Sequence, residues 1–401
     1  MLPKSGKLTS FLNLVVPEEK MTKMSKREYL AELKKKYWRS RKKQKGQLLN
    51  DFCDFTKYHR KYALSLLNKP LPKRWKRYKP RKRIYDQEVV DALLVLWRAA
   101  DEICAERFQP FIPELLDKMV DCREITVSNT VRKKLLKISL ITVKRIVGQA
   151  KHRSLVRIGG TTRPGSLIKS QIAIRYQPWQ ETDPGWFELD TVAHCGETVA
   201  GDFIYSLNMI DIATGWNELS AIWGKGERNT LEQFKIIEKR LPFKILGIDP
   251  DNGGEFINWH MHKYCQKQNY NFTRSRPYHK NDNAHIEQKN WTAVRQLIGY
   301  ERLDRPEQLK MLNDLYVNEW RLYLNFFQPT MKLKEKIKNV KTGKSRKRYF
   351  EAKTPYQRLL EHPKVDSKTK DMLRCIYKQL NPVTLKREIK RKIGLLKKML
   401  K

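Results

Sequence analysis

Three carboxylates stand at positions from which they could act together on one substrate. Asp190 lies in the apolar residues 186–194, a pattern typical of a buried strand. Asp251 begins an Asp-Asn-Gly-Gly-Glu-Phe turn after a second apolar run, and Glu287 lies where a loop gives way to a helix. Thirty-five residues separate Asp251 from Glu287. Because clustered carboxylates repel one another unless cations compensate their charge, the pattern favours a site for Mg²⁺ or Mn²⁺.

Such a site would transfer phosphoryl groups without a protein nucleophile. Two ions about 3.5–4 Å apart can activate an attacking hydroxyl and stabilise the leaving oxygen of an in-line displacement. The alternative without a function is that the three carboxylates are ordinary surface acids at strand ends and in turns. Asp249 is the local competitor of Asp251, because the two lie on the same side of an extended chain.

Four further titratable residues lie close to the three acids in sequence. Asp211 and Glu255 are expected to have structural roles. His194 and His285 are alternatives as a general base or an extra metal ligand, although core or hydrogen-bonding roles are favoured.

The three acids resemble the motif of the DDE transposase and retroviral integrase superfamily, specifically the integrase-like transposases of bacterial insertion sequences. In that family the first Asp is on the first strand of an RNase-H-like sheet. The second stands in an Asp-Asn-Gly turn followed by Glu-Phe, and the Glu opens a late helix. Asp190, Asp251 and Glu287 match these features, and the resemblance is closest over residues 185–305.

The resemblance implies two successive reactions. Water cuts DNA at the end of a mobile element, and the freed 3′-hydroxyl then attacks target DNA. It implies Mg²⁺ or Mn²⁺ as cofactor, as two ions, double-stranded DNA as partner, and a homodimer or higher multimer that holds two element ends. Retroviral integrases also carry an N-terminal His/Cys zinc domain. That part of the pattern is absent here, because Cys53 and His59 lack partners.

The composition favours a polyanionic partner. The 401 residues include 83 Lys and Arg against 43 Asp and Glu, which gives a formal charge of +40. Nucleic acid is the preferred partner, since phosphate neutralisation supplies affinity, and a membrane surface is the runner-up. Six scattered cysteines form no Cys-x-x-Cys pair and indicate a reducing compartment. No segment is long and apolar enough to span a bilayer, so we expect a bacterial, nucleoid-associated protein of the cytoplasm, with no membrane partner.

The sequence predicts a multidomain protein. An α/β RNase-H-like catalytic core is preceded by all-α helix-turn-helix domains and followed by a small basic C-terminal region with a β-element. The expected divisions are a basic arm at 1–43, a helix-turn-helix at 44–68, a basic Pro-rich linker at 69–83, a second helical DNA-binding domain at 84–151, a linker at 152–180, the catalytic domain at 181–305 and a basic DNA-binding or interaction region at 306–401.

Within the catalytic domain, strands are expected at 186–194, 203–212, 216–222, 244–248 and 270–273, with helices at 229–239 and 256–268 and a third that contains Glu287. The C-terminal region should hold a β-element within 332–350 and a basic amphipathic helix at 385–401.

Basic residues at helix starts, in the linker and near the acids are the expected DNA contacts, although a solvated face explains many such charges. Ser139 is expected to cap the helix that carries the second group. The predicted contacts are His59, Arg60, Lys61, Lys73, Arg74, Lys76, Arg77, Thr142, Lys144, Arg145, Arg274, Arg276, Lys289 and Arg295.

The hypothesis that follows is a DNA transposase that binds the terminal inverted repeats of a mobile element and catalyses metal-dependent strand cleavage and 3′-hydroxyl strand transfer. The alternatives are a metal-dependent nuclease of the same fold without strand transfer, and a domesticated DNA-binding repressor.

Overall fold

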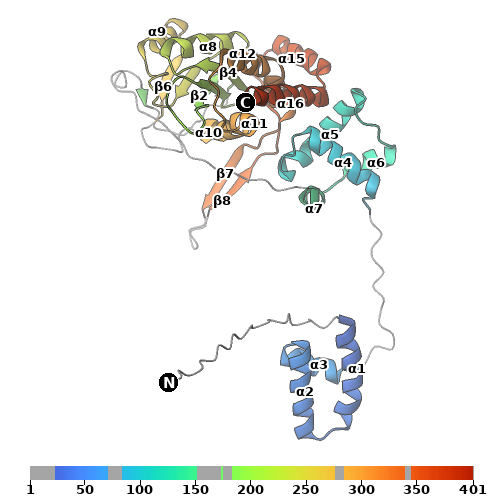
Figure 1. Ribbon diagram of the computed structural model, residues 1–401. Coiled ribbons are helices and arrows are strands. Elements are labelled where there is room, and N and C mark those ends of the chain that lie inside the picture. The colour runs from blue at the N-terminus through green and yellow to red at the C-terminus, as the bar shows by residue number, and fades with distance from the viewer. Residues whose placement is uncertain are drawn as a thin grey trace, which may run out of the picture. The chain divides into compact units, whose positions relative to one another are not determined.

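The computed structural model describes residues 23–70, 84–150, 173–174, 183–275, 284–338 and 345–400. The chain divides into two compact units, Met1–Lys82 and Arg83–Lys401 (Figure 1). Most of the predicted linkers at 69–83 and 152–180 lies outside the described residues.

The first unit is a bundle of three helices, α1 (Lys23–Arg39), α2 (Lys42–Thr56) and α3 (Arg60–Asn68). Lys57 adopts the left-handed conformation that ends α2 and turns the chain into α3. The helix pair predicted within 44–68 is therefore present. A third helix from the expected basic arm completes its core, because one face of α1 is apolar. The buried core residues are Leu30, Leu33, Tyr37, Leu49, Phe52, Ala63 and Leu67.

The second unit is built on a mixed six-stranded sheet in the order β1-β6-β5-β2-β3-β4. β2, β3 and β4 are antiparallel, whereas β2, β5, β6 and β1 run parallel to one another. The strands are β1 (Ala173–Ile174), β2 (Trp186–Ala193), β3 (Ile204–Asp211), β4 (Asn217–Trp223), β5 (Gly247–Pro250) and β6 (Asn271–Arg274). The predicted α/β core is confirmed, with its five expected strands within a few residues of their expected positions.

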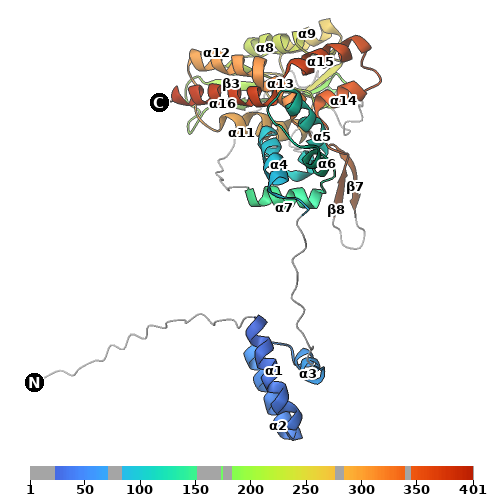
Figure 2. The same ribbon diagram turned by 90° about the vertical axis from the view of Figure 1, so that its right-hand side faces the viewer.

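Helices cover both faces of this sheet (Figures 1 and 2). α8 (Glu227–Lys239) and α9 (Trp259–Gln268) pack on one face over an apolar core that includes Phe187 and Leu189 of β2. Successive strand residues point to opposite faces. Glu188 and Asp190 therefore face the other side, where α10 (Ala284–Lys289) and the π-helical segment η2 (Asn290–Arg295) pack against β2.

The flanking helices belong to the same compact unit as the sheet. Their apolar residues share one continuous core with the second face of the sheet. The Tyr323 hydroxyl donates to the Ala99 carbonyl at 2.7 Å, and the Lys118 ammonium donates to the Tyr377 carbonyl at 2.7 Å. These helices are α4 (Gln87–Ala99), α5 (Ala105–Asp121), α6 (Asn129–Leu136), α7 (Leu140–Ala150), α11 (Gln296–Ile298), α12 (Pro306–Leu315), η3 (Tyr316–Trp320), α13 (Arg321–Phe327), α14 (Pro355–Glu361), α15 (Ser367–Gln379) and α16 (Pro382–Lys398). Residues 84–150 and 306–400 are thus joined to the core rather than set apart from it.

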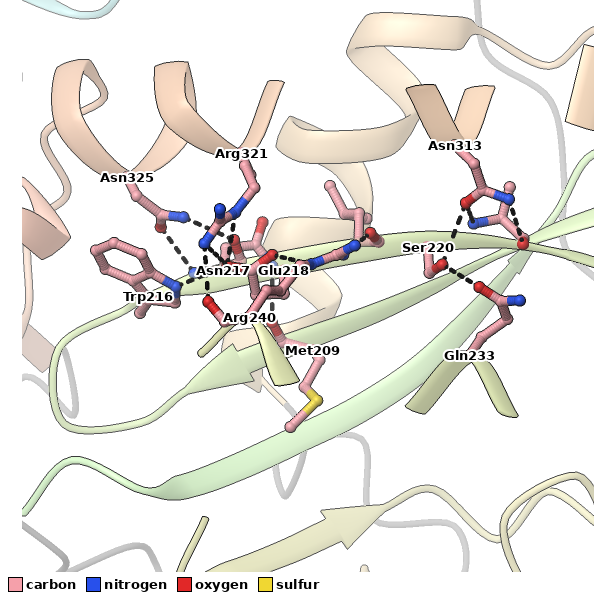
Figure 3. A network of polar contacts seen from close by, with 12 residues as sticks. Met209, Trp216, Asn217, Glu218, Ser220, Gln233, Arg240, Asn313, Arg321 and Asn325 are labelled. Atoms are coloured by element: carbon pink, nitrogen blue, oxygen red, sulfur yellow. Dashed lines mark hydrogen bonds and ion pairs between the residues drawn. The ribbon is translucent and has the colours of Figure 1, made fainter. Parts of the chain in front are cut away.

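A buried polar network fastens the C-terminal helices to the edge strand β4 (Figure 3). The fully buried Glu218 carboxylate accepts from Arg240 at 2.7 Å and from Arg321 of α13 at 3.0 Å. Asn325 of α13 exchanges hydrogen bonds with the backbone of Asn217, as a neighbouring strand would. The side chains on α13 thereby satisfy buried groups that would otherwise cost free energy.

Two local predictions are also confirmed. A two-stranded sheet of β7 (Leu333–Lys338) and β8 (Ser345–Tyr349) forms the expected β-element. The Ser139 hydroxyl accepts from the Thr142 amide at 3.3 Å at the start of α7. Among the described helices, none combines the length and the apolar character that crossing a membrane requires.

Candidate active site

Asp190 lies within β2, and Asp251 directly follows the neighbouring parallel strand β5. The two residues are at the same level of the sheet. The register pairs Glu188 with Asp249 and Leu189 with Pro250, so the next positions on β2 and after β5 are Asp190 and Asp251. The Asn-Gly turn begins at this point, and the Gly253 amide donates to the Asp251 carboxylate at 2.9 Å. The sheet therefore brings the first two predicted acids together.

The Asp190 carboxyl is in an environment that disfavours its charge. Burial and the adjacent Asp251 carboxylate raise the pKa of Asp190 to about 7. Two hydrogen-bond donors to this carboxylate lower its pKa in part: the Thr191 backbone amide at 2.7 Å and the Asn290 side-chain amide at 2.5 Å. Asn290 begins η2, so this hydrogen bond joins the strand to the helical segment that follows Glu287.

Glu287 lies on α10, which is fastened to β2 on both sides of this residue. The buried Glu188 carboxylate accepts from the Ile286 amide at 2.9 Å, and Asn290 contacts Asp190. Residues three apart on a helix have Cβ atoms about 5–6 Å apart, so Glu287 and Asn290 are neighbours on the helix surface. The Glu287 side chain is exposed. Within the described part of the chain, no three His, Cys, Asp or Glu side chains gather closely enough to hold a metal ion together.

A fourth acid, Glu255, lies beside the pair although its sequence pattern indicated a structural role. Its nearly buried carboxylate pairs with Lys225 at 2.7 Å and accepts from the Thr191 hydroxyl at 2.8 Å. Its charge also contributes to the raised pKa of Asp190. A Cβ at Gly253 would collide with this carboxylate, so any larger residue there would displace the Glu255 side chain from its present contacts. The Glu-Phe of the turn motif was the signal that could have placed Glu255 here.

The remaining acids and histidine have structural partners. Asp249 is fully buried and accepts from the Thr273 hydroxyl at 2.9 Å. Asp211 accepts from the Gly185 amide at 2.8 Å and from the backbone and hydroxyl of Thr214, in the loop between β3 and β4. Buried His194 hydrogen-bonds Ser206 at 2.7 Å, and burial and Arg295 lower its pKa to about 3. The side chain of His285 lies outside the described residues.

The predicted DNA contacts are distributed over both units. His59, Arg60 and Lys61 are exposed at the start of α3, and Arg60 also hydrogen-bonds Asn50. On α7, Arg145 is exposed, Lys144 pairs with Glu106 at 2.6 Å, and Thr142 contacts the capping Ser139. Arg274 is mostly buried and donates to Asn252 at 2.9 Å. Lys73, Arg74, Lys76, Arg77 and Arg276 lie outside the described residues.

The alternative to DNA contact for Lys289 and Arg295 was a solvated helix face, which does not hold for Lys289, whereas Arg295 is partly exposed. The Lys289 side chain is buried, and this burial, together with Arg107 and Arg358, lowers its pKa to about 7. The Arg295 guanidinium is stacked 4.7 Å from the centre of the Tyr300 ring. Sequence periodicity alone did not indicate which side of this helix would be covered.

Comparison with known proteins places these features in context. The chain is 35% identical over 308 residues to the uncharacterized protein y4rM of Sinorhizobium fredii (strain NBRC 101917 / NGR234), which covers 76% of this chain and 86% of that protein. No model of a known protein family matches the chain.

Among solved structures, the catalytic core of HTLV-2 integrase in complex with magnesium is 16% identical, with a TM-score of 0.28, and covers 40% of this chain and 93% of that core. The core of BIV integrase is 15% identical, with a TM-score of 0.28, and covers 43% of this chain and 91% of that core.

Proposed function

This chain belongs to the family of the uncharacterized protein y4rM, and we propose that it is a DNA transposase that cuts the ends of a mobile element and joins them to target DNA. The observation that carries the proposal is the pairing of Asp190 and Asp251 at one level of the adjacent strands β2 and β5. Glu287 lies on the helix fastened beside them. Two paired carboxylates, with a third on an adjoining helix, are the side chains that metal-dependent phosphoryl transfer would use, and we propose that metal binding draws Glu287 to the pair.

The donor set of this site fits a divalent cation. Asp190 and Asp251 offer carboxylate oxygens, and a cation would relieve the repulsion that raises the pKa of Asp190. Asp190, Asp251 and Glu287 are the proposed ligands. Mg²⁺ or Mn²⁺ held there, as a pair of ions, would supply the Lewis acidity that activates the attacking hydroxyl and stabilises the leaving oxygen. Asn290 and Thr191 hold the Asp190 carboxylate in place for this role.

The proposed partner is double-stranded DNA, both element ends and target. The formal charge of +40 supplies the long-range attraction. The exposed His59, Arg60 and Lys61 stand at the start of α3, the proposed recognition helix of a helix-turn-helix, where base edges and phosphates would be contacted. Two ends must be held for joining, so the proposed active form is a homodimer or higher multimer.

The experiment is joining of a labelled duplex, carrying the terminal repeat of the element that encodes the chain, to plasmid DNA with Mg²⁺ or Mn²⁺. Wild type should join the label. Glu287→Gln, which keeps the size of the side chain and removes its charge, should lower joining by more than about 100-fold, since even outer partners of metal ligands are worth about 10–100-fold. Glu232→Gln is the matched control, because Glu232 is also an exposed helical carboxylate, on α8.

The other outcomes are equally informative. Undiminished joining by Glu287→Gln would remove this residue from the site. Cutting without joining would assign a nuclease, and sequence-specific binding without cutting would assign a repressor.

A further inference from the structure

A cavity of about 910 Å³ lies behind the proposed catalytic helix within the second unit. It is bordered by the start of α5, the loop between β3 and β4, η2 and the chain after α13. Its wall begins at Gln288, the residue after Glu287, and continues through Lys289 and Trp291. Arg107 and Lys332 supply further positive charge from the other sides.

Two of these cations have no partner of opposite charge among the described residues. Lys289 is only 6% exposed, and no hydrogen bond or ion pair joins its ammonium group to another described residue. Arg107 lies close enough to disfavour the charge of Lys289, and its guanidinium likewise makes no hydrogen bond or ion pair within the described chain. Lys332, in contrast, donates to the carbonyls of Ile212 and Ala213.

The acids that line the cavity either have hydrogen-bond or ion-pair partners elsewhere or are exposed to solvent. Asp101 pairs with Lys386 at 2.7 Å. Asp211 accepts the hydrogen bonds of Gly185 and Thr214 described above. Glu102 is exposed. Lys289 and Arg107 thus both line the cavity without a counter-charge among the described residues, so an anionic ligand that enters it would meet donors that no described acid occupies.

We propose that this cavity binds a terminal phosphate monoester, namely the 5′-phosphate that DNA cleavage produces. Lys and Arg are the usual donors to phosphate oxygens. Hydrolysis of a phosphodiester forms a bond from the water oxygen to phosphorus and breaks the bond from phosphorus to the 3′-oxygen, which takes up the proton. The products are a 3′-hydroxyl and a 5′-phosphate. The DNA source of the phosphate rests on the proposed function, whereas the anion site does not.

The geometry favours a chain end over an internal phosphate. An internal phosphodiester has a sugar on each side and a single charge, whereas the Lys289 side chain that it would have to reach is only 6% exposed. A terminal phosphate has one flank and up to two charges. Trp291, which is 46% exposed at the same cavity, offers a ring on which the terminal base can stack.

The test compares the affinity of the full chain for two duplexes that differ only in a 5′-phosphate or a 5′-hydroxyl, measured by fluorescence anisotropy in EDTA. Wild type should bind the phosphorylated duplex about tenfold more tightly, which corresponds to about 1.4 kcal/mol. Lys289→Met should remove this preference. Lys310→Met, which removes an exposed charge on α12 away from the cavity, should keep it. Because EDTA prevents catalysis, failure of the joining reaction cannot produce the same result.

A second arm uses inorganic phosphate alone and follows the thermal unfolding of the same variants. A phosphate-induced rise in melting temperature that Lys289→Met abolishes, without any preference between duplexes, would assign the cavity to free phosphate and overturn the DNA-end proposal. Equal responses of Lys289→Met and Lys310→Met in both arms would overturn the anion site altogether. Arg107→Gln, at a partly exposed position, should lose the same preference and serves if Lys289→Met does not fold.

Discussion

Asp190 is held at the end of a chain of side-chain amides that crosses the sheet. Asn290 donates to Asp190 and accepts from Asn208 at 2.8 Å, Asn208 accepts from Asn217 at 2.6 Å, and the Asn217 amide donates to Asn325 at 2.8 Å. The side-chain amides of Asn290 and Asn208 both donate and accept, and the last link uses the backbone amide of Asn217, so the members orient one another. The carboxylate on β2 is therefore tied to α13, more than a hundred residues away in the sequence.

His194 gives the second unit a pH dependence that can be measured. Its folded pKa is about 3, below the ordinary 6.5, so between these values the unfolded chain binds a proton that the folded chain does not. The contribution of His194 to the free energy of unfolding, which is opposite in sign to that of Asp190 with its raised pKa, should therefore be at its full value above pH 6.5. It should fall by about 1.4 kcal/mol per pH unit below that, or about 2 kcal/mol by pH 5. Denaturant unfolding at several pH values measures this slope.

Two variants test whether His194 causes this pH dependence, and each replaces one histidine by glutamine. His194→Gln removes the buried titrating group, so between pH 6.5 and 5 the free energy of unfolding of wild type should fall relative to that of this variant by about 2 kcal/mol. His260→Gln changes an exposed histidine on α9 and should keep the wild-type slope. Equal slopes for all three proteins would show that His194 does not carry the effect.

At the scale of elements, the sequence was most informative where a pattern reports burial along one strand. The apolar residues 186–194 predicted β2, which spans Trp186–Ala193, and the Asn-Gly turn predicted the end of β5. Strand register then brings Asp190 and Asp251 together. The apolar pattern of a strand could not indicate which helix would pack against the face that carries Asp190. Asn290 and Glu188 look like ordinary polar residues in the sequence, and their roles depend on the packing of α10 against β2.

The attachment of α13 to β4 should depend strongly on Glu218. Glu218→Gln leaves Arg240 and Arg321 without their shared carboxylate in a site where neither is more than one-fifth exposed. Breaking a buried ion pair from one side costs about 3–5 kcal/mol, and we expect a loss of this order in the free energy of unfolding.

The control is Glu335→Gln on the hairpin of β7 and β8. Glu335 pairs with Arg348 at 2.9 Å, but both side chains are largely exposed, so the loss should stay within about 1 kcal/mol. Chemical denaturation of the two variants and wild type gives the comparison. Similar small losses for both would mean that Glu218 does not anchor α13.

At the scale of the whole molecule, the sequence indicated helices but not what each helix packs against. An amphipathic pattern shows that one face is buried and leaves the covering surface open. The basic residues of α16 suggested DNA or a partner helix, yet its apolar side lies in the shared core, and Lys392 pairs with Glu319 at 2.6 Å. The physical reason is distance along the chain: α16 contacts α12, η3 and α13, some seventy residues earlier, and also α4, nearly three hundred residues earlier.

The position of α16 in the core leads to a prediction about stability. Leu396 is 3% exposed, and truncating a buried leucine costs its transfer free energy plus that of the cavity left behind. Leu396→Ala should therefore lower the free energy of unfolding of the second unit by about 2–5 kcal/mol. Met372→Ala on α15 is the control, because Met372 is 46% exposed and surface changes of this kind stay within about 0.5 kcal/mol. A helix that served only as a basic DNA-binding tail would give equally small losses for both variants. A large loss for Leu396→Ala alone would assign α16 to the folded core that it shares with the second face of the sheet.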